Sequence, residues 1–191
     1  MNTKAILTRG IQVTTFLFAA FNNFLMNITP PGETESRFAV GISSLLALFI
    51  LLFISAISMN QPRKRLRKIW LTTSVIFFAV VVIASYIYKS NLDKLTFSFP
   101  PGSQKLEHIA GTTLTPEAMN YQKEHPFKTA SEIVADYGGL AFIERVWTRD
   151  SIQRAKMILT INYVLVVLSI AAMIFSLTEG ILVVKKRVTN G

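Results

Sequence analysis

The sequence predicts an all-α membrane protein with four transmembrane helices and a small extracytoplasmic cap between the third and fourth helices. Hydrophobic residues make up 51% of the 191 residues and charged residues only 16%, against roughly 25% charged residues in soluble domains. The hydrophobic residues gather in four long uncharged runs, and short basic clusters separate these runs. This pattern excludes a soluble enzyme, a disordered tail and a disulfide scaffold. The lack of cysteine also excludes a thiolate metal site and a cysteine nucleophile.

Each uncharged run is long enough for a transmembrane helix, which needs about 20 apolar residues to cross roughly 30 Å of hydrocarbon. The four runs hold 23, 25, 20 and 22 residues between their flanking charges. We therefore expect transmembrane helices at residues 11–28, 39–59, 69–88 and 157–184.

The first run is the least apolar, because three asparagines interrupt it and Pro30-Pro31 ends it. A secretory signal peptide is an alternative, since Lys4 and Arg9 precede an apolar stretch. No A-x-A cleavage site follows before Asn22, so we interpret the run as an uncleaved first helix.

The basic residues predict the orientation. The N-terminal stretch, the connection between the second and third helices and the C-terminal tail together hold ten basic and no acidic side chains. Residues 89–156 hold nine basic and eight acidic side chains. The positive-inside rule then places both termini in the cytoplasm and residues 89–156 outside. We expect a multi-pass protein of the bacterial inner (plasma) membrane.

Residues 89–156, which we call the cap, are too few to bury a large core. We expect the cap to pack on helix ends or on neighbouring subunits. Capping and turn residues predict its elements. We expect a turn or extended linker at 97–103, a helix from Thr115 to about His125, and a helix from Thr129 or Ser131 to Gly138-Gly139. A strand or buried connector should follow at 140–147. A last helix should begin at Asp150 or Ser151 and continue as the fourth transmembrane helix.

The sequence offers little for catalysis or metal binding. The two histidines, His108 and His125, each follow a glutamate, a pairing common on polar helix surfaces and weak as a metal site. A phosphate-binding glycine loop and the hydrolase and metalloprotease motifs are missing from the sequence. We expect no enzymatic activity, no catalytic residue, no cofactor and no bound metal.

The basic connection before the third helix is the strongest local signal. Five cations within six residues attract anionic lipid, and they could equally dock an acidic protein or nucleic acid. The alternative is a topology signal alone. We predict a partner or anionic-lipid contact, without direct nucleic-acid binding, at Arg63, Lys64, Arg65, Arg67 and Lys68.

Two helix faces are candidates for helix packing or an oligomer interface. Asn23 and Asn27 share one face of the first helix with Thr15 and Ala19, where they need hydrogen-bond partners. A pore lining is the alternative for this face. The second face is a stripe of small residues on the fourth helix, Ala172, Ser176 and Gly180, which allows close approach of backbones.

The overall layout resembles the KwaA family, the membrane subunits of the bacterial Kiwa anti-phage defence system. The resemblance lies in the basic N-terminus, the four runs, the tight basic connection at Arg63–Lys68 and one polar insertion before the last helix, with the distinctive stretch at residues 115–152. It implies a homo-oligomeric membrane sensor that works with a cytoplasmic DNA-binding effector protein. It matches no motif residue by residue.

We therefore expect a non-enzymatic sensor and scaffold subunit in contact with membrane lipids, with Tyr137 and Trp147 as candidates for extracytoplasmic sensing. Two alternatives remain. One is an immunity protein against a pore-forming bacteriocin, since those proteins are also small helix bundles. The other is a small channel or holin-like protein, motivated by the asparagine face of the first helix.

Overall fold

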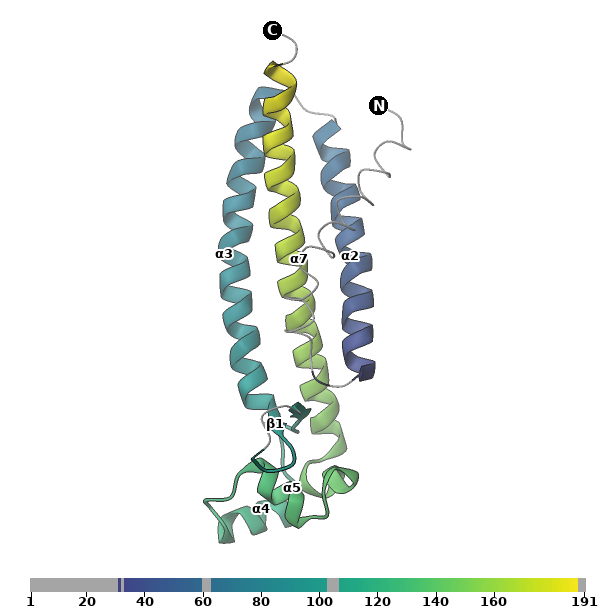
Figure 1. Cartoon of the computed structure of the whole chain (residues 1–191), viewed down its shortest axis with the longest axis vertical. Helices are drawn as coiled ribbons and strands as arrows, with labels where there is room; N and C mark the ends of the chain where they lie inside the picture. The colour runs from purple at the N-terminus through teal and green to yellow at the C-terminus, as the bar shows by residue number, and fades with distance from the viewer. Residues whose placement is uncertain (1–30, 32, 60–62, 103–106, 189–191) are drawn as a thin grey trace. The chain divides into compact units, whose positions relative to one another are not determined.

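A computed structural model describes residues 31, 33–59, 63–102 and 107–188 (Figure 1). The described part is all-α, as predicted, apart from one two-stranded sheet. The first predicted helix, 11–28, with Asn23 and Asn27, lies outside the described residues.

Three described helices are long and apolar enough to cross a membrane. They are α2 (Glu33–Met59), α3 (Arg63–Leu95) and α7 (Arg149–Val188), and they contain the second, third and fourth predicted segments. Their apolar windows are Arg37–Ile54, Lys68–Leu95 and Arg149–Ile181.

Helix α3 extends beyond Tyr88, where the uncharged run ends, to Leu95. The first charged residue of the extension, Lys89, pairs with Asp93 one turn later, with 2.8 Å between Nζ and Oδ1. Such i,i+4 pairs support a helix on its exposed face. The hydroxyl of Thr96 donates to the Leu92 carbonyl (2.7 Å) at the end of the helix, so local polar contacts continue it past the apolar run.

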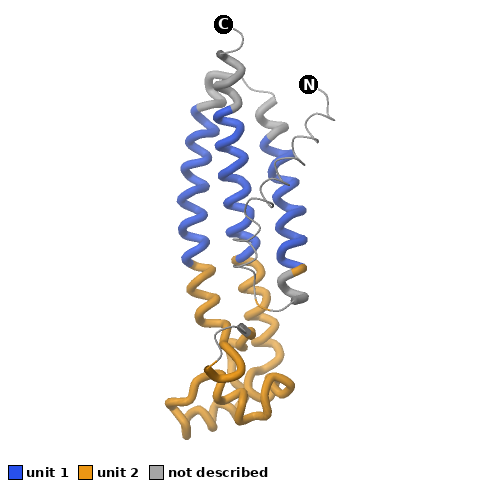
Figure 2. Tube along the Cα trace, in the orientation of Figure 1, with its two compact units in different colours: residues 1–29, 38–86, 163–191 blue, residues 30–37, 87–162 orange. Residues whose placement is uncertain are grey.

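The chain divides into two compact units (Figure 2). Unit 1 comprises residues 1–29, 38–86 and 163–191, and unit 2 comprises residues 30–37 and 87–162. Each unit is described by itself.

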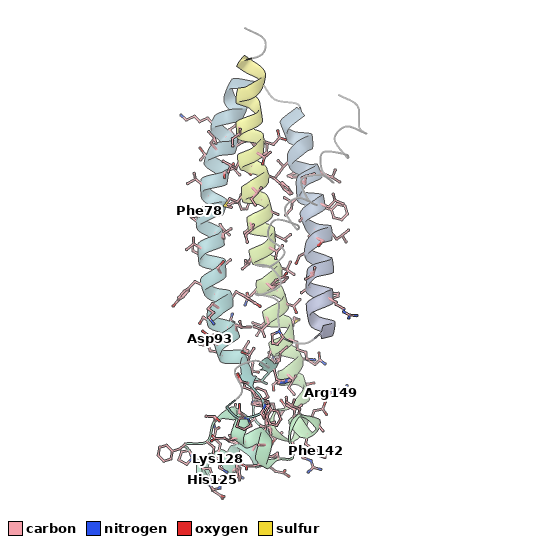
Figure 3. All side chains as sticks on the ribbon, in the orientation of Figure 1. Phe78, Asp93, His125, Lys128, Phe142 and Arg149 are labelled. Carbon is pink, nitrogen blue, oxygen red and sulfur yellow. The ribbon has the colours of Figure 1, made fainter. Side chains whose placement is uncertain are left out.

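Unit 1 is a helical unit in which α2, α3 and α7 share a core. This core contains Ala47, Leu51, Ile54, Trp70, Ala171 and Phe175. Helices α3 and α7 run antiparallel, since Leu71 contacts Gly180 while Ser74 donates to the Met173 carbonyl (3.2 Å). Large apolar side chains on the other faces are exposed, such as Phe49 and Phe78, which is labelled in Figure 3.

Unit 2 contains a hairpin and short helices. Strand β1 (Thr96–Ser98) pairs antiparallel with β2 (Glu107–Ile109), placing Phe97 opposite His108. The helical elements that follow are α4 (Pro116–Glu124), α5 (Ala130–Asp136), the 3₁₀ turn η1 (Leu140–Phe142) and α6 (Ile143–Val146).

The capping residues predicted the start of both longer helices of the cap. Thr115 caps α4 by accepting a hydrogen bond from the Ala118 amide, and Thr129 caps α5 together with Glu132 in a capping box. The chain leaves α4 at His125 before Pro126, and it leaves α5 at Gly138 and Gly139, both with positive φ.

Two expectations for the cap differ from the structure, at residues 140–147 and at the start of the last helix. Residues 140–147 form η1 and α6 rather than a strand, and only the end of this stretch makes a β-bridge, between Leu114 and Trp147. The predicted turn or extended linker at 97–103 agrees with the described residues, since 97–98 lie in the extended strand β1 and 99–102 form a bend and a turn. The last helix begins at Arg149, before both predicted capping residues.

The cap also has a hydrophobic core of its own. Its buried members are Phe97, Ala110, Ala118, Ile133, Val134, Val146, Trp147 and Ile152. These residues come from the hairpin, from α4 to α6 and from the first turn of α7, so long-range contacts assemble a small core, in keeping with a segment too short to bury a large one.

Candidate functional site

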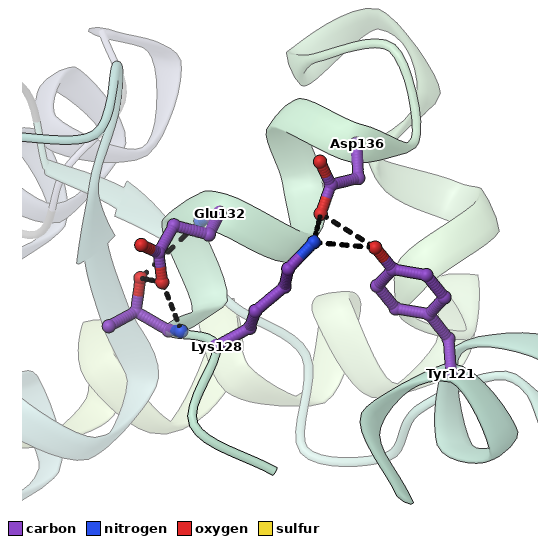
Figure 4. A network of polar contacts seen from close by, with 5 residues as sticks. Tyr121, Lys128, Glu132 and Asp136 are labelled. Atoms are coloured by element: carbon purple, nitrogen blue, oxygen red, sulfur yellow. Dashed lines mark hydrogen bonds and ion pairs between the residues drawn. The ribbon is translucent and has the colours of Figure 1, made fainter. Parts of the chain in front are cut away.

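The polar surface of the cap centres on Tyr121, Lys128 and Asp136 (Figure 4). The ammonium of Lys128 donates to Asp136 Oδ2 (2.6 Å) and to the Tyr121 hydroxyl (2.7 Å). The Tyr121 hydroxyl donates to the same carboxylate oxygen (2.9 Å). These bonds join α4, the connection after it and α5, so they fix the α4–α5 turn to both helices.

This network shifts two pKa values in opposite directions. The hydrogen bond from Lys128, followed by that from Tyr121, lowers the pKa of the Asp136 carboxyl. The same two bonds raise the pKa of the Lys128 ammonium. Both shifts favour the charged forms, so the ion pair is intact around neutral pH.

A second polar contact fixes the first turn of α5. The Thr129 amide donates to the Glu132 carboxylate (2.7 Å), and the Thr129 hydroxyl donates to the same oxygen (2.8 Å). The hydrogen bond from the Thr129 backbone has the larger effect and that from its hydroxyl the smaller, and both lower the pKa of the Glu132 carboxyl. The Ser131 hydroxyl donates to the Ser98 carbonyl, which connects α5 to β1.

The α4–α5 turn presents an aromatic side chain to solvent. Phe127 is 97% exposed, and the Lys128 amide beside it donates to the His125 carbonyl (3.2 Å). Phe127 was not among the predicted site residues. The sequence signal that could have indicated its exposure is its position directly after Pro126, in the short connection between two helices with threonine caps.

The two predicted sensing residues lie in different environments. Tyr137 is half-buried at the end of α5 and contacts Tyr121 edge-on, with 5.6 Å between ring centroids. Burial raises its pKa, with smaller contributions from Glu117, Tyr121 and Glu124. Trp147 is 5% exposed and packs on Phe97, with 5.2 Å between ring centroids. Tyr137 thus adjoins the polar surface, whereas Trp147 supports the core beneath it.

The small-residue stripe of α7 is buried in unit 1. Ala172, Ser176 and Gly180 are all buried, and a Cβ on Gly180 would lie 3.1 Å from Leu71 Cδ2 on α3. In the described residues this stripe packs within the chain.

The basic segment lies in the first two turns of α3. Arg63, Lys64, Arg65, Arg67 and Lys68 are all within this helix. Of their side chains, the structure describes that of Lys68, which is exposed.

The described residues do not group three or more histidine, aspartate or glutamate side chains in a possible metal site. The His125 ring contacts the Tyr121 ring at a tilt of 53°, with 4.5 Å between ring centroids, and the His108 ring lies 5.9 Å from that of Phe97. Comparisons with protein-family models, with curated proteins and with solved structures found no match for this chain.

Proposed function

We propose that this protein is a non-enzymatic sensor and scaffold subunit of an anti-phage defence complex in the bacterial inner membrane. In this proposal the chain crosses the membrane four times, with both termini in the cytoplasm and the cap outside. Three apolar helices of spanning length and the asymmetric distribution of basic residues support this topology. The resemblance to the KwaA family supports the defence role, homo-oligomerisation and a cytoplasmic DNA-binding effector.

The observation that carries the sensor role is the continuity between the core of the cap and a helix of spanning length. Ile152, in the first turn of α7, belongs to the core around Trp147. From Arg149 to Val188 the chain is one unbroken helix. An event that repacks the cap core therefore acts directly on the start of a helix that, in our proposal, ends in the cytoplasm.

The scaffold role is assigned to the basic start of α3. Anionic lipids attract such a basic segment by about 1 kcal/mol per charge near the surface, and an acidic face of an effector protein would be attracted in the same way. Tyr137 is assigned to the outer surface that meets the trigger, and Trp147 to the core that responds to it.

The test is a crosslinked pull-down from cells that carry the native operon, followed by mass spectrometry. We expect a cytoplasmic nucleic-acid-binding protein encoded nearby to be recovered. Reversing Arg63, Lys64 and Arg65 to glutamate should reduce its recovery, whereas the matched reversal of Lys185, Lys186 and Arg187 should reduce it less.

Phage and toxin challenges separate the proposal from its main alternative. Protection against phage that requires the neighbouring gene supports the defence role. Protection against one bacteriocin, with indifference to phage, would instead identify an immunity protein and leave the basic segment as a topology signal.

A further inference from the structure

One face of α7 carries an exposed arginine directly before exposed apolar residues. Met157 and Ile161 are 59% and 58% exposed, and Arg154, three positions before Met157, is exposed as well. With 3.6 residues per turn, these three side chains lie within about 60° of one another around the helix axis. On the opposite side, Ala155 and Leu159 are fully buried. The exposed face of α7 is therefore amphiphilic, with a cation at its start and apolar side chains after it.

Arg154 has no partner within the cap that would compensate its charge. Among the described residues, the ion pairs and hydrogen bonds of the cap do not include its guanidinium. Asp150 lies one turn earlier on the same face, at the i,i+4 spacing at which ion pairs form on helices, but the two side chains do not pair in the structure. A guanidinium stays charged and offers five N–H donors, so Arg154 presents an uncompensated cation.

The neighbouring cations of the cap are engaged or lie on another side of the helix. Nε of Arg149 lies 3.9 Å from a carboxylate oxygen of Glu144. The Arg145 guanidinium lies over the Phe142 ring, 4.6 Å from its centroid. Lys156 is half-buried, and two residues of helix turn it away from the exposed face. The arginine of the exposed face is thus distinct in its surroundings from the basic residues on either side of it.

The length of the apolar run places this arginine at a membrane surface. Between Lys156 and Glu179 the helix carries 22 uncharged residues, which span about 33 Å at 1.5 Å per residue. The hydrocarbon core of a bilayer is about 30 Å thick, so the run fills it when Met157 lies at its edge. Arg154 then lies about 4.5 Å further along the axis. Long helical side chains point toward the N-terminus of their helix, which directs its guanidinium toward the headgroups.

The headgroup region offers a ligand that matches both parts of the exposed face. Guanidinium groups bind phosphate oxygens through two parallel hydrogen bonds. Phosphatidylglycerol carries a phosphate without an ammonium group to compete for it, unlike zwitterionic phospholipids. Its acyl chains cover Met157 and Ile161 while its phosphate meets Arg154, so a single lipid molecule satisfies the cation and the apolar side chains together.

We propose that Arg154 binds the phosphate of an anionic phospholipid in the outer leaflet, while the acyl chains of that lipid cover Met157 and Ile161. The inference rests on the membrane topology in the proposed function and goes beyond it by naming a lipid class and the residue that holds it. Because Ile152 of the same helix belongs to the cap core, a lipid held at Arg154 fixes the depth at which the cap meets the membrane.

The experiment uses a fluorescent label beside the proposed site. Met157→Cys provides the attachment point, since the chain has no cysteine of its own, and phosphatidylglycerol with a spin-labelled acyl chain quenches the fluorophore when it binds there. In detergent, Arg154→Gln should raise the lipid concentration needed for half-quenching about fivefold, the effect of removing one charge near the surface. Arg154→Lys keeps the charge and should restore most of the affinity, which distinguishes lost binding from misfolding.

Three further arms define the ligand and the residue. Arg149→Gln is the matched control on the same helix and should change the half-quenching concentration less than about twofold. Asp150→Asn removes the neighbouring carboxylate and should lower that concentration. An excess of inorganic phosphate should leave quenching by the lipid unchanged. Equal shifts for Arg154→Gln and Arg149→Gln, no shift for either, or displacement of the lipid by inorganic phosphate would overturn the proposal.

Reconstitution into vesicles separates this inference from the topology on which it rests. The whole labelled chain is placed in vesicles of phosphatidylcholine and phosphatidylglycerol that contain the spin-labelled lipid. Quenching of the label at residue 157, together with no effect of Arg154→Gln in detergent, overturns the lipid site and leaves the membrane helix in place. A label that is quenched by aqueous iodide and not by the spin-labelled lipid overturns the proposed course of α7, and the lipid site with it.

Discussion

Gly111 lies directly against Trp147 in the cap core. A β-carbon added at residue 111 would fall 2.5 Å from Trp147 Cβ and 2.3 Å from Ser151 Oγ. Side-chain carbons do not approach so closely in proteins, so only glycine fits between these residues. The Ser151 hydroxyl donates to the Thr113 and Thr148 carbonyls, which fixes the segment after Gly111 to the start of α7.

Gly111→Ala should destabilise the cap by about 1–3 kcal/mol, the usual cost of overpacking a core. The tryptophan fluorescence of the folded protein in detergent micelles and its Tm provide the measurement. Gly41→Ala is the matched control, because a β-carbon there meets nothing within 4 Å. In a helix this control should be neutral or stabilising by about 0.5–1 kcal/mol. Equal effects of both variants would contradict the packing described for Gly111.

The Lys128–Asp136 pair should make cap stability depend on pH at both extremes. The pKa of Asp136 is lowered, so its contribution is fully present above the ordinary value of 3.8 and is lost as the pH falls through its folded pKa. The pKa of Lys128 is raised, so its contribution is present below 10.5 and is lost as the pH rises through its folded pKa. The difference in Tm between wild type and Asp136→Asn should be constant from about pH 5 to 9 and shrink outside this window.

Lys128→Gln provides the control for this pH profile. It removes the other partner, so it should give the same profile as Asp136→Asn, and combining both changes should add little. Parallel curves for wild type and Asp136→Asn at acid pH would show that the pair does not contribute.

The contact between Leu71 and Gly180 should appear as coupling between α3 and α7. Gly180→Val places two methyl groups where Leu71 already lies 3.1 Å from the β-carbon position, and should cost about 1–3 kcal/mol. Leu71→Ala makes room for them, so the double variant should be less destabilised than the sum of the single variants. Additive effects in a double-mutant cycle of Tm or denaturant unfolding would argue that the two residues do not touch.

The proposed topology can be tested with single cysteines, because the chain has none of its own. Phe127→Cys should react with a membrane-impermeant maleimide in intact spheroplasts. Lys68→Cys, also exposed, should react only after the membrane is permeabilised. Labelling of both positions in intact spheroplasts, or of Lys68→Cys alone, would refute the orientation derived from the basic residues.

Local signals in the sequence predicted much of the secondary structure. Threonine caps mark the starts of α4 and α5, and Pro126 and Gly138 mark their ends, because capping and chain reversal depend on residues a few positions apart. The apolar runs likewise predicted the cores of α2, α3 and α7.

Features that depend on distant residues were missed. The hairpin pairs Thr96 with Ile109, and Gly111 owes its role to Trp147. Residues 140–147 are apolar enough for a strand, but their contacts with distant parts of the chain favour the helical elements η1 and α6. The hydrogen bonds of Lys128 with Tyr121 and Asp136 depend on the arrangement of α4 and α5 in space. The spacing of these residues in the sequence does not reveal that arrangement.

The membership of Ile152 in the cap core has a consequence for how the protein is made. Ribosomes deliver the chain from its N-terminus, so Phe97 and Trp147 are synthesised before the residue that completes their packing. The cap therefore cannot finish folding until the last helix has begun to emerge, and its apolar side chains stay uncovered during that interval. Truncation just before residue 149 should yield a cap that is prone to aggregation and proteolysis, whereas the whole chain completes this core once the start of α7 has formed.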